Sequence, residues 1–293
     1  MAHALATCCF CGVGCGIYLE TSGDRIVGAY PSMSHPANRG RICVRGWHVH
    51  EVASSPDRLK APLLRKKGAL VEVSWDEAYG FIAERLRAIR DRHGPDAIGF
   101  VSSTHCSNEE SYLLQKLARS VIGTNNVDHG ISVHRTNTIQ ALSEMLGVPA
   151  ATCSIADIER SDVIVVDGVD LAKGSPTIGG WVLRARLRGA KVIVVGARHS
   201  RIAVNADMFL QNRPRTEIHL YGAMAKIIVD RGLMDMKFIK ARCRGYEEFL
   251  ARVKEYDVLW AAEQCDVPPE SIEEAALAFA RAGIVIRDCD AEL

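Results

Sequence analysis

Long apolar runs, an excess of charge of one sign and a phosphate-binding loop are all missing from this chain of 293 residues. No apolar run approaches the ~20 residues of a membrane-spanning helix, which argues against a membrane span. Basic and acidic residues number 36 and 35, so the net charge of +1 gives no sign of nucleic acid or an anionic membrane as a partner. No G-x-x-x-x-G-K-[ST] loop and no internal repeat are present, so nucleotide binding of that kind and a solenoid fold are not indicated.

An export signal is also not recognisable, because the N-terminus MAHALATCC has no basic segment ahead of an apolar one. Ten cysteines in a chain without such a signal indicate reduced thiols and a metal centre rather than a disulfide framework. With 48% hydrophobic and 24% charged residues, the composition is that of an ordinary globular protein with room for more than one domain. The sequence therefore predicts a cytoplasmic protein.

Four of the ten cysteines occur within eight residues, in the stretch TCCFCGVGCGIY. Cys8, Cys11 and Cys15 have the spacing C-x2-C-x3-C, and Cys43 follows after a gap of 27 residues. Three clustered thiolates and one distant thiolate are typical of a loop around a [4Fe–4S] cluster, with one ligand for each iron. A zinc site is the alternative, but zinc sites usually pair two C-x2-C units and no second unit is present. Cys9 is then a neighbour of the cluster and not a ligand.

The remaining cysteines and histidines lack the spacing of metal ligands. The isolated cysteines are expected to be buried thiols; they are Cys153, Cys243, Cys265 and Cys289. Two close pairs of polar side chains are expected to be hydrogen-bonded structure, with metal ligation as the less favoured interpretation; they are His105 with Cys106, and His129 with His134.

The first half of the chain contains recognisable start and stop signals. Residues 17–21 and 25–30 predict a β-hairpin around the turn Ser22-Gly23-Asp24. Ser74 with Glu77 predicts a capping box at the start of a helix over residues 75–92, which Gly94-Pro95 ends. A strand over 70–73, a buried strand over 97–102 and helices over 109–122 and 137–146 are also expected.

In the second half, short apolar segments bounded by polar residues alternate with helical segments, which predicts a parallel sheet covered on both faces. The expected strands are residues 162–166, 191–195, 208–210 and 284–286, and the expected helices are 178–187, 217–230, 236–241, 246–253 and 269–282. The predicted fold is α/β: a small N-terminal [4Fe–4S] module with short strands (1–60), an α/β domain (61–148), and a doubly wound α/β domain with a mainly parallel, Rossmann-like sheet (149–293).

Several stretches are shared with one enzyme family, among them CGVGCGIYLE, HPANRGRICVRG, VSWDEA, NEESYLLQKLARSVIGTNNVDH and GAKVIVV. Through them the chain resembles the N-terminal part of the molybdopterin-dependent formate dehydrogenase catalytic subunits. The resemblance implies a [4Fe–4S] cluster on Cys8, Cys11, Cys15 and Cys43, followed by α/β domains that cradle a bis-pterin molybdenum or tungsten cofactor. It also implies that the remaining domains of the family are absent from this chain.

The chain departs from the family at the metal ligand. After the run Thr-Asn-Asn-Val-Asp, the family has a cysteine or selenocysteine that ligates the metal, followed by a histidine. Aligned without gaps, these positions are His134 and Arg135. His134 supplies no thiolate or selenolate, and Arg135 is no proton acceptor near neutral pH. The proline that usually follows is Asn137.

The positions that hold the pterin nucleotides in the family are also altered. The family's Gly-Ser-Asn, Asp-Pro-Arg and Arg-Pro-Gly-Thr-Asp correspond here to Gly168-Val169-Asp170, Gly196-Ala197-Arg198 and Arg213-Pro214-Arg215-Thr216-Glu217. The lysine between the cluster and the pterin is Arg45. So many changes in one site predict that bis-molybdopterin guanine dinucleotide is absent.

The sequence therefore predicts an electron-transfer subunit that carries one [4Fe–4S] cluster and performs no substrate chemistry. Its expected partners are flavin or iron–sulfur subunits of a larger redox complex, with no nucleic acid and no membrane span. The alternative is a molybdenum or tungsten formate dehydrogenase whose missing domains lie on a separate chain. A third alternative is a structural subunit that the cluster holds together.

Overall fold

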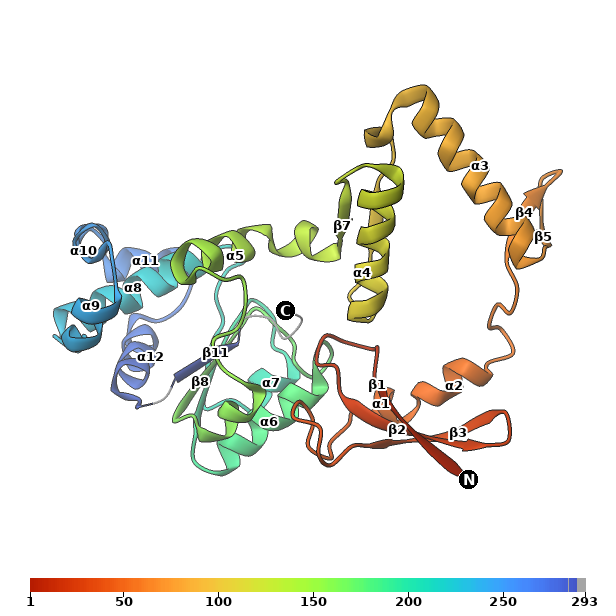
Figure 1. Cartoon of the computed structure of the whole chain (residues 1–293). Coiled ribbons are helices and arrows are strands. Elements are labelled where there is room, and N and C mark those ends of the chain that lie inside the picture. Colours follow the sequence, from red (N-terminus) through yellow and green to blue (C-terminus); the bar gives the residue numbers. More distant parts are fainter. Residues whose placement is uncertain (284, 289–293) are drawn as a thin grey trace. The chain divides into compact units, whose positions relative to one another are not determined.

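The computed structural model describes the backbone of residues 1–283 and 285–288, and the side chains of these residues except 131–134 and 285–288. The chain divides into two compact units, Met1–Ala151 and Thr152–Leu293. The mixed α/β architecture expected from the sequence is confirmed, with short N-terminal strands followed by parallel strands and helices (Figure 1). A separate module ending at residue 60 stays a prediction.

The first unit contains two hairpin-like sheets, a short parallel strand pair and several helices. Its described elements are β1 (Ala2–Thr7), β2 (Gly16–Ser22), β3 (Arg25–Pro31), α1 (Val44–Trp47), α2 (Val49–Ser54), β4 (Leu63–Lys66), β5 (Ala69–Glu72), α3 (Trp75–His93), β6 (Phe100–Ser102), α4 (Asn108–Lys116), a π-helical turn (Leu117–Ile122), β7 (Val127–His129) and α5 (Gly130–Leu146).

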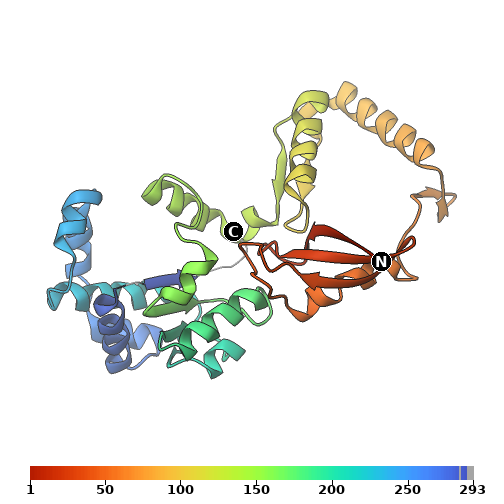
Figure 2. The same cartoon turned by 60° about the horizontal axis from the view of Figure 1, so that its bottom comes forward.

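The strands β1, β2 and β3 form one antiparallel sheet, shown in red in Figure 2, with α1 and α2 packed against β3. The predicted hairpin is confirmed as β2 and β3, and Gly23 adopts the left-handed conformation (φ 57°) that the tight turn requires. The strand β1 was not predicted, because its alternation of small and apolar residues is too weak to distinguish from a loop. Its pairing brings Thr7 opposite Gly16, so the cysteine-rich loop is closed at its base.

Other elements of the first unit differ from the sequence prediction in detail. The helix α3 begins as expected, with the Ser74 hydroxyl accepting the Glu77 N–H at 3.2 Å. The Glu77 carboxylate instead binds Lys66 at 2.5 Å, because β4 pairs with β5 and presents a cation beside the helix start. The helix α5 begins at Gly130 rather than at residue 137, because Gly130 follows directly on β7, which pairs with β6.

The second unit is built around a four-stranded sheet. Its described elements are a 3₁₀ segment (Ile155–Arg160), β8 (Val163–Asp167), α6 (Pro176–Leu187), β9 (Lys191–Val195), α7 (Arg201–Val204), β10 (Met208–Leu210), α8 (Glu217–Asp230), α9 (Met236–Arg242), α10 (Tyr246–Lys254), α11 (Val258–Cys265), α12 (Pro269–Arg281) and β11 (Val285–Asp288). The helix α11 was not expected. The predicted last strand begins one residue later, and its residue 284 lies outside the described part of the chain.

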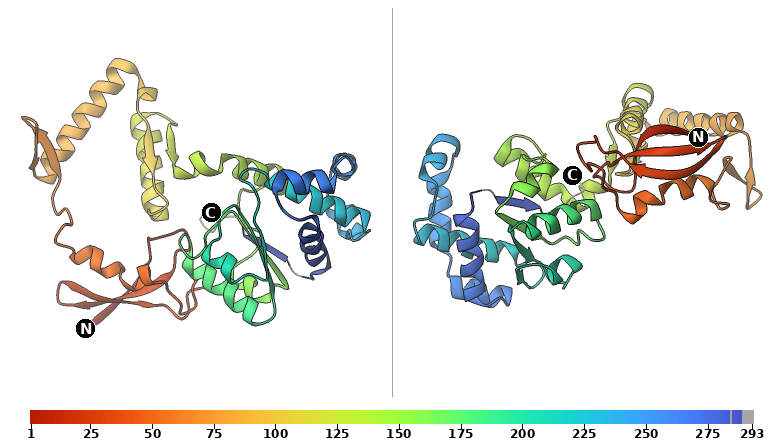
Figure 3. Two further views of the ribbon diagram at one scale, coloured as in Figure 1. Left: turned by 180° about the vertical axis from the view of Figure 1, so that it is seen from behind. Right: turned by 90° about the horizontal axis from the view of Figure 1, so that it is seen from below.

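The strand order is β10-β9-β8-β11, and all neighbours are parallel. Successive side chains of β8 and β9 point to opposite faces of the sheet. Because the residues on both faces are mainly apolar and buried, both faces must be covered. On one face Val163, Val165 and Ile193 pack against α8, α11 and α12 in one core. On the other face lies α6, whose Trp181 is fully buried. Figure 3 shows these two helix layers, green and blue, on opposite sides of the sheet.

Candidate functional site

The cysteine-rich loop joins β1 to β2, and backbone hydrogen bonds fix its shape. The N–H of Cys8 donates to the carbonyl of Cys15 at 2.8 Å, and the N–H of Gly14 donates to the carbonyl of Cys11 at 3.3 Å. Gly14 has φ 59°, a conformation in which a side chain would be strained. The first and third cysteines of the motif therefore stand at the base of the loop, and both are buried.

Asn38 connects this loop to the segment that carries the distant cysteine. Its Oδ1 accepts the N–H of Gly16 at 2.9 Å, while its Nδ2 donates to the carbonyls of Gly16 at 3.0 Å and Arg41 at 2.8 Å. The side chain is fully buried. Because Gly16 follows Cys15 and Arg41 precedes Cys43 by two residues, one amide holds both parts of the ligand set together.

Burial and the neighbouring thiols act on the pKa of Cys8. Burial raises the pKa of the Cys8 thiol, the N–H of Phe10 opposes this rise, and the neighbouring Cys9, Cys43 and Cys11 raise the pKa further. A buried thiol of this kind is suited to a cation centre, because coordination deprotonates it and neutralises its charge.

The donor set, four thiols from two loop segments, has the composition of an iron–sulfur site. Among the described residues, no three His, Cys, Asp or Glu side chains are grouped as ligands of one metal ion. In a [4Fe–4S] cluster each thiolate binds a different iron, so the four sulfurs surround a volume instead of a point. Four thiols, with Cys8 and Cys15 buried beside apolar Val13 and Ile17, have the chemistry that such a cluster needs.

Two residues beside this site form hydrogen bonds whose partners the sequence did not indicate. His105 Nδ1 lies 2.7 Å from the carbonyl oxygen of Cys9, which ties the loop after β6 to the cysteine loop. No local pattern links residues that are 96 positions apart. Asn38 was recognised only as part of a loop, since an asparagine between Pro36 and Gly40 reads as a turn residue.

The prediction of buried thiols elsewhere is partly wrong. Cys265 is buried and its Sγ donates to the carbonyl of Thr216 at 3.3 Å, whereas Cys153 and Cys243 are exposed. Both exposed cysteines lie outside regular elements, at the start of the second unit and after α9, so no apolar face carries them into the core. Cys289 lies outside the described residues.

In the second unit the carboxyl ends of β8, β9 and β10 form the edge at which parallel sheets bind ligands. Gly168 has φ 70° and open space where a side chain would be. Gly196 comes next to it and donates its N–H to the carbonyl of Leu210 at 3.2 Å. This glycine edge gives a ligand access to the backbone.

The loop after β10 has a side chain network of its own. Asn212 is buried, and its Nδ2 donates to Glu217 Oε1 at 3.1 Å and to Thr216 Oγ1 at 3.3 Å. Arg215 adopts φ 68°, a left-handed conformation that is unfavourable for a residue with a side chain. The carboxylate at position 217 is therefore already hydrogen-bonded within the protein.

The residues at the expected pterin-metal position lie in the first turns of α5. The side chain of His134 lies outside the described residues, and Arg135 is buried. His129, the other histidine of this pair, is half-buried at the end of β7. Neither His134 nor Arg135 has a sulfur or selenium atom, and their correspondence to the metal-binding positions of the family stays a prediction.

The comparisons with known proteins agree on one family. The family model described as molybdopterin oxidoreductase matches residues 58–262, and that of the molybdopterin oxidoreductase Fe4S4 domain matches residues 1–55. Within the described part of the chain, no helix has the length and apolar character needed to cross a membrane.

Curated relatives match almost the whole chain. The F420-dependent formate dehydrogenase 1 subunit alpha of Methanococcus maripaludis is 40% identical over 275 residues, which are 94% of this chain and 40% of that protein. A putative formate dehydrogenase of Staphylococcus aureus is 36% identical over 280 residues, 95% of this chain and 28% of that protein. The chain thus spans less than half the length of these relatives.

Among solved structures, acetylene hydratase from Pelobacter acetylenicus superimposes with a TM-score of 0.83 at 26% identity, over 97% of this chain and 39% of that one. The family matches, the relatives and the fold are concordant. The chain belongs to the molybdopterin oxidoreductase family, carries that family's Fe4S4 domain at its N-terminus, and is similar to formate dehydrogenase alpha subunits.

Proposed function

We propose that this chain is an electron-transfer subunit that holds one [4Fe–4S] cluster on Cys8, Cys11, Cys15 and Cys43. The observation that carries the proposal is that the Asn38 side chain hydrogen-bonds both Gly16, next to Cys15, and Arg41, two residues before Cys43. The match to the Fe4S4 domain supports it independently.

When bound, such a cluster takes up and releases electrons at a potential that its surroundings set. The protein side chains hold the cluster in place and shield it from water. The four thiolates bind the irons, buried Val13 and Ile17 limit the access of water, and His105 secures the loop through the Cys9 carbonyl.

We further propose that the chain holds no molybdenum or tungsten pterin and does no chemistry on a substrate. Position 134 is a histidine where the family has its thiolate or selenolate ligand. Position 215 is an arginine in a left-handed conformation, and the carboxylate of Glu217 is bound by Asn212. These features leave neither the metal nor the nucleotide its usual protein ligands.

The partners that fit this role are other redox subunits, with flavin or iron–sulfur centres, that deliver and accept electrons. Matching relatives are named as alpha subunits, which supports a multi-subunit context. We place the complex in the cytoplasm, because exposed cysteines such as Cys106 and Cys243 persist as thiols in a reducing compartment.

The rival function is catalytic: a molybdenum or tungsten formate dehydrogenase whose further domains complete the site. The open glycine edge at Gly168 favours it, since no atom lies within 4 Å of the place where a Cβ would be. Metal and cofactor analysis of the native complex separates the two functions. Our proposal predicts about four irons and four sulfides per chain, without molybdenum, tungsten or extractable pterin. Molybdenum or tungsten together with pterin, in a one-to-one ratio with this chain, would replace the proposal by the rival.

A further inference from the structure

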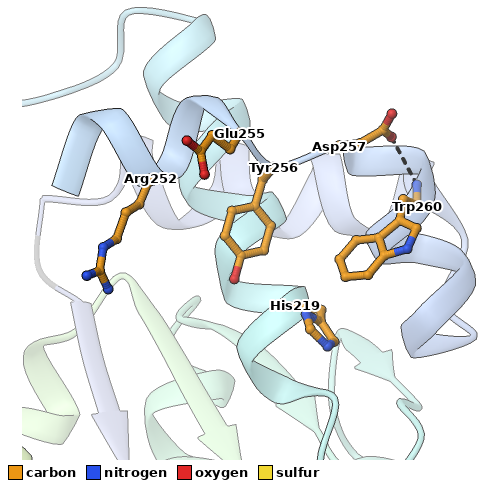
Figure 4. Close-up of a pocket in the computed structure, with 6 residues that line it drawn as sticks. All are labelled: His219, Arg252, Glu255, Tyr256, Asp257 and Trp260. Carbon is orange, nitrogen blue, oxygen red and sulfur yellow. Dashed lines mark hydrogen bonds between the residues drawn. The ribbon is translucent and has the colours of Figure 1, made fainter. Parts of the chain in front are cut away.

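A pocket of about 620 Å³ lies in the second unit, beside the first turn of α8. It is lined by His219 of α8, Arg252 of α10, the loop residues Glu255, Tyr256 and Asp257, and Trp260 of α11. Figure 4 shows Tyr256 directed from the loop toward α8, with Arg252 on one side and Trp260 on the other. The volume is in the range of small-molecule sites, which is roughly 300–1,000 Å³.

Two aromatic walls of the pocket are fixed by the backbone around them. The ring of Tyr256 lies directly on Gly222 of α8, where any side chain would collide with it. Asp257 caps α11 by accepting the N–H of Trp260 at 2.9 Å, and this bond fixes the backbone position from which the indole extends. The indole then meets the ring of His219 edge to face, with centroids 4.8 Å apart and planes at 75°.

Several polar groups of the pocket have donors or acceptors that no other described residue satisfies. The Nδ1 atom of His219 is shielded from solvent and has no hydrogen-bond partner in the described part of the chain. Neither the Arg252 guanidinium nor the Glu255 carboxylate forms a hydrogen bond or ion pair with another described side chain. A shielded nitrogen without a partner is costly, and because this atom is closed to water, His219 lines the pocket through its other atoms.

We propose that this pocket binds a small molecule with a flat aromatic ring and an anionic group, a phosphate or a carboxylate. Tyr256 and Trp260 offer faces on which a ring can stack. Arg252 supplies a planar fork of donors for the anion. Glu255 accepts from an amino or ring N–H group, so a purine mononucleotide or an indole carboxylate satisfies the site. The inference does not depend on the proposed electron-transfer function.

Calorimetric titration of the full chain tests the proposal with probes that separate its parts. AMP carries ring and phosphate, adenosine lacks the phosphate, and ribose 5-phosphate lacks the ring; indole-3-acetate is the carboxylate probe. We expect saturable binding of AMP or of indole-3-acetate. If AMP binds, adenosine and ribose 5-phosphate should each bind with an affinity at least about tenfold lower than that of AMP. Whichever of the two main probes binds identifies the source of the anion.

Variants then locate the binding. Arg252→Gln is expected to weaken it at least about tenfold, as loss of one charge-assisted contact does. Lys254→Gln, which removes an exposed cation two residues away on the same helix, is the matched control and should leave affinity unchanged. Trp260→Ala should lower the affinity because it removes a stacking surface. Gly222→Ala should lower it because the added methyl group displaces the ring of Tyr256. Absence of saturable binding by both main probes, or equal effects of Arg252→Gln and Lys254→Gln in proteins with the same circular dichroism, would overturn the proposal.

Discussion

Replacing Asn38 by alanine removes the connection between the cysteine loop and the segment that carries Cys43. The buried N–H of Gly16 then loses its partner, whereas the carbonyl of Gly16 keeps the N–H of Ser32 at 2.9 Å. A buried donor without a partner costs about 1–3 kcal/mol, and the lost bond to Arg41 adds about 1 kcal/mol. We therefore expect Asn38→Ala to lower the free energy of unfolding by about 2–4 kcal/mol, a large part of the stability of an ordinary domain.

The loss should also appear in the cluster, because the segment released is the one that delivers the fourth thiolate. After anaerobic reconstitution, we expect iron and sulfide contents well below those of the unmodified chain. Asn38→Asp should behave similarly, since it keeps an acceptor for Gly16 but sets a buried carboxylate against two carbonyl oxygens. Asn205→Ala is the control, because the Asn205 amide makes one exposed bond, to the carbonyl of Arg201 at 2.9 Å. Full iron content together with an unchanged free energy of unfolding in Asn38→Ala would refute the reasoning.

Three other predictions concern the ligands, the altered metal position and the sheet. Cys43→Ser should lower the iron content, whereas Cys9→Ser should leave iron and the EPR spectrum unchanged; the opposite pattern would reassign the ligands. His134→Ala should leave electron transfer by the intact complex nearly unchanged, and a large loss with the cluster preserved would give this histidine a direct role. Burial acts to raise the pKa of Asp207, but a backbone N–H and a nearby arginine outweigh it, so the folded pKa is lowered. The stabilisation is therefore present at neutral pH and is lost as the pH falls through the folded pKa. Asp207→Asn should lower the free energy of unfolding by about 1 kcal/mol at pH 7 and by less near pH 4, with Asp230→Asn as the exposed control; an equal loss at both pH values would contradict this.

Much of the second unit could be predicted, because the sequence pattern that specifies its strands and helices is local. The strands β8, β9 and β10 are short apolar runs between polar residues, and a strand buried on both faces needs that composition. The helix α11 was missed because it is only eight residues long and its cap, Asp257, follows closely on α10. The exposure of Cys153 and Cys243 could not be predicted either, since burial depends on which residues the neighbouring elements cover.

In the first unit the cysteine spacing indicated the chemistry but not the geometry. Spacing shows which residue types are close along the chain, so Cys8, Cys11 and Cys15 were grouped correctly by sequence alone as one loop. The strand β1 that closes this loop has little amphipathic pattern, and only its pairing with β2 makes it a strand. A strand of this kind is specified by its neighbour more than by its own residues.

The sequence by itself determined the alternation of strands and helices. It also predicts the four cysteine ligands and the replacement, at position 134, of the thiolate found in the family. Each of these is a property of residue identity and short-range order. Only the tertiary structure decided that Asn38 joins Gly16 to Arg41, that His105 secures the Cys9 carbonyl, and that Tyr256 and Trp260 enclose a pocket with His219. The physical reason is that hydrogen bonds and ring contacts between distant segments depend on how the backbone brings them together, and no local pattern encodes that distance.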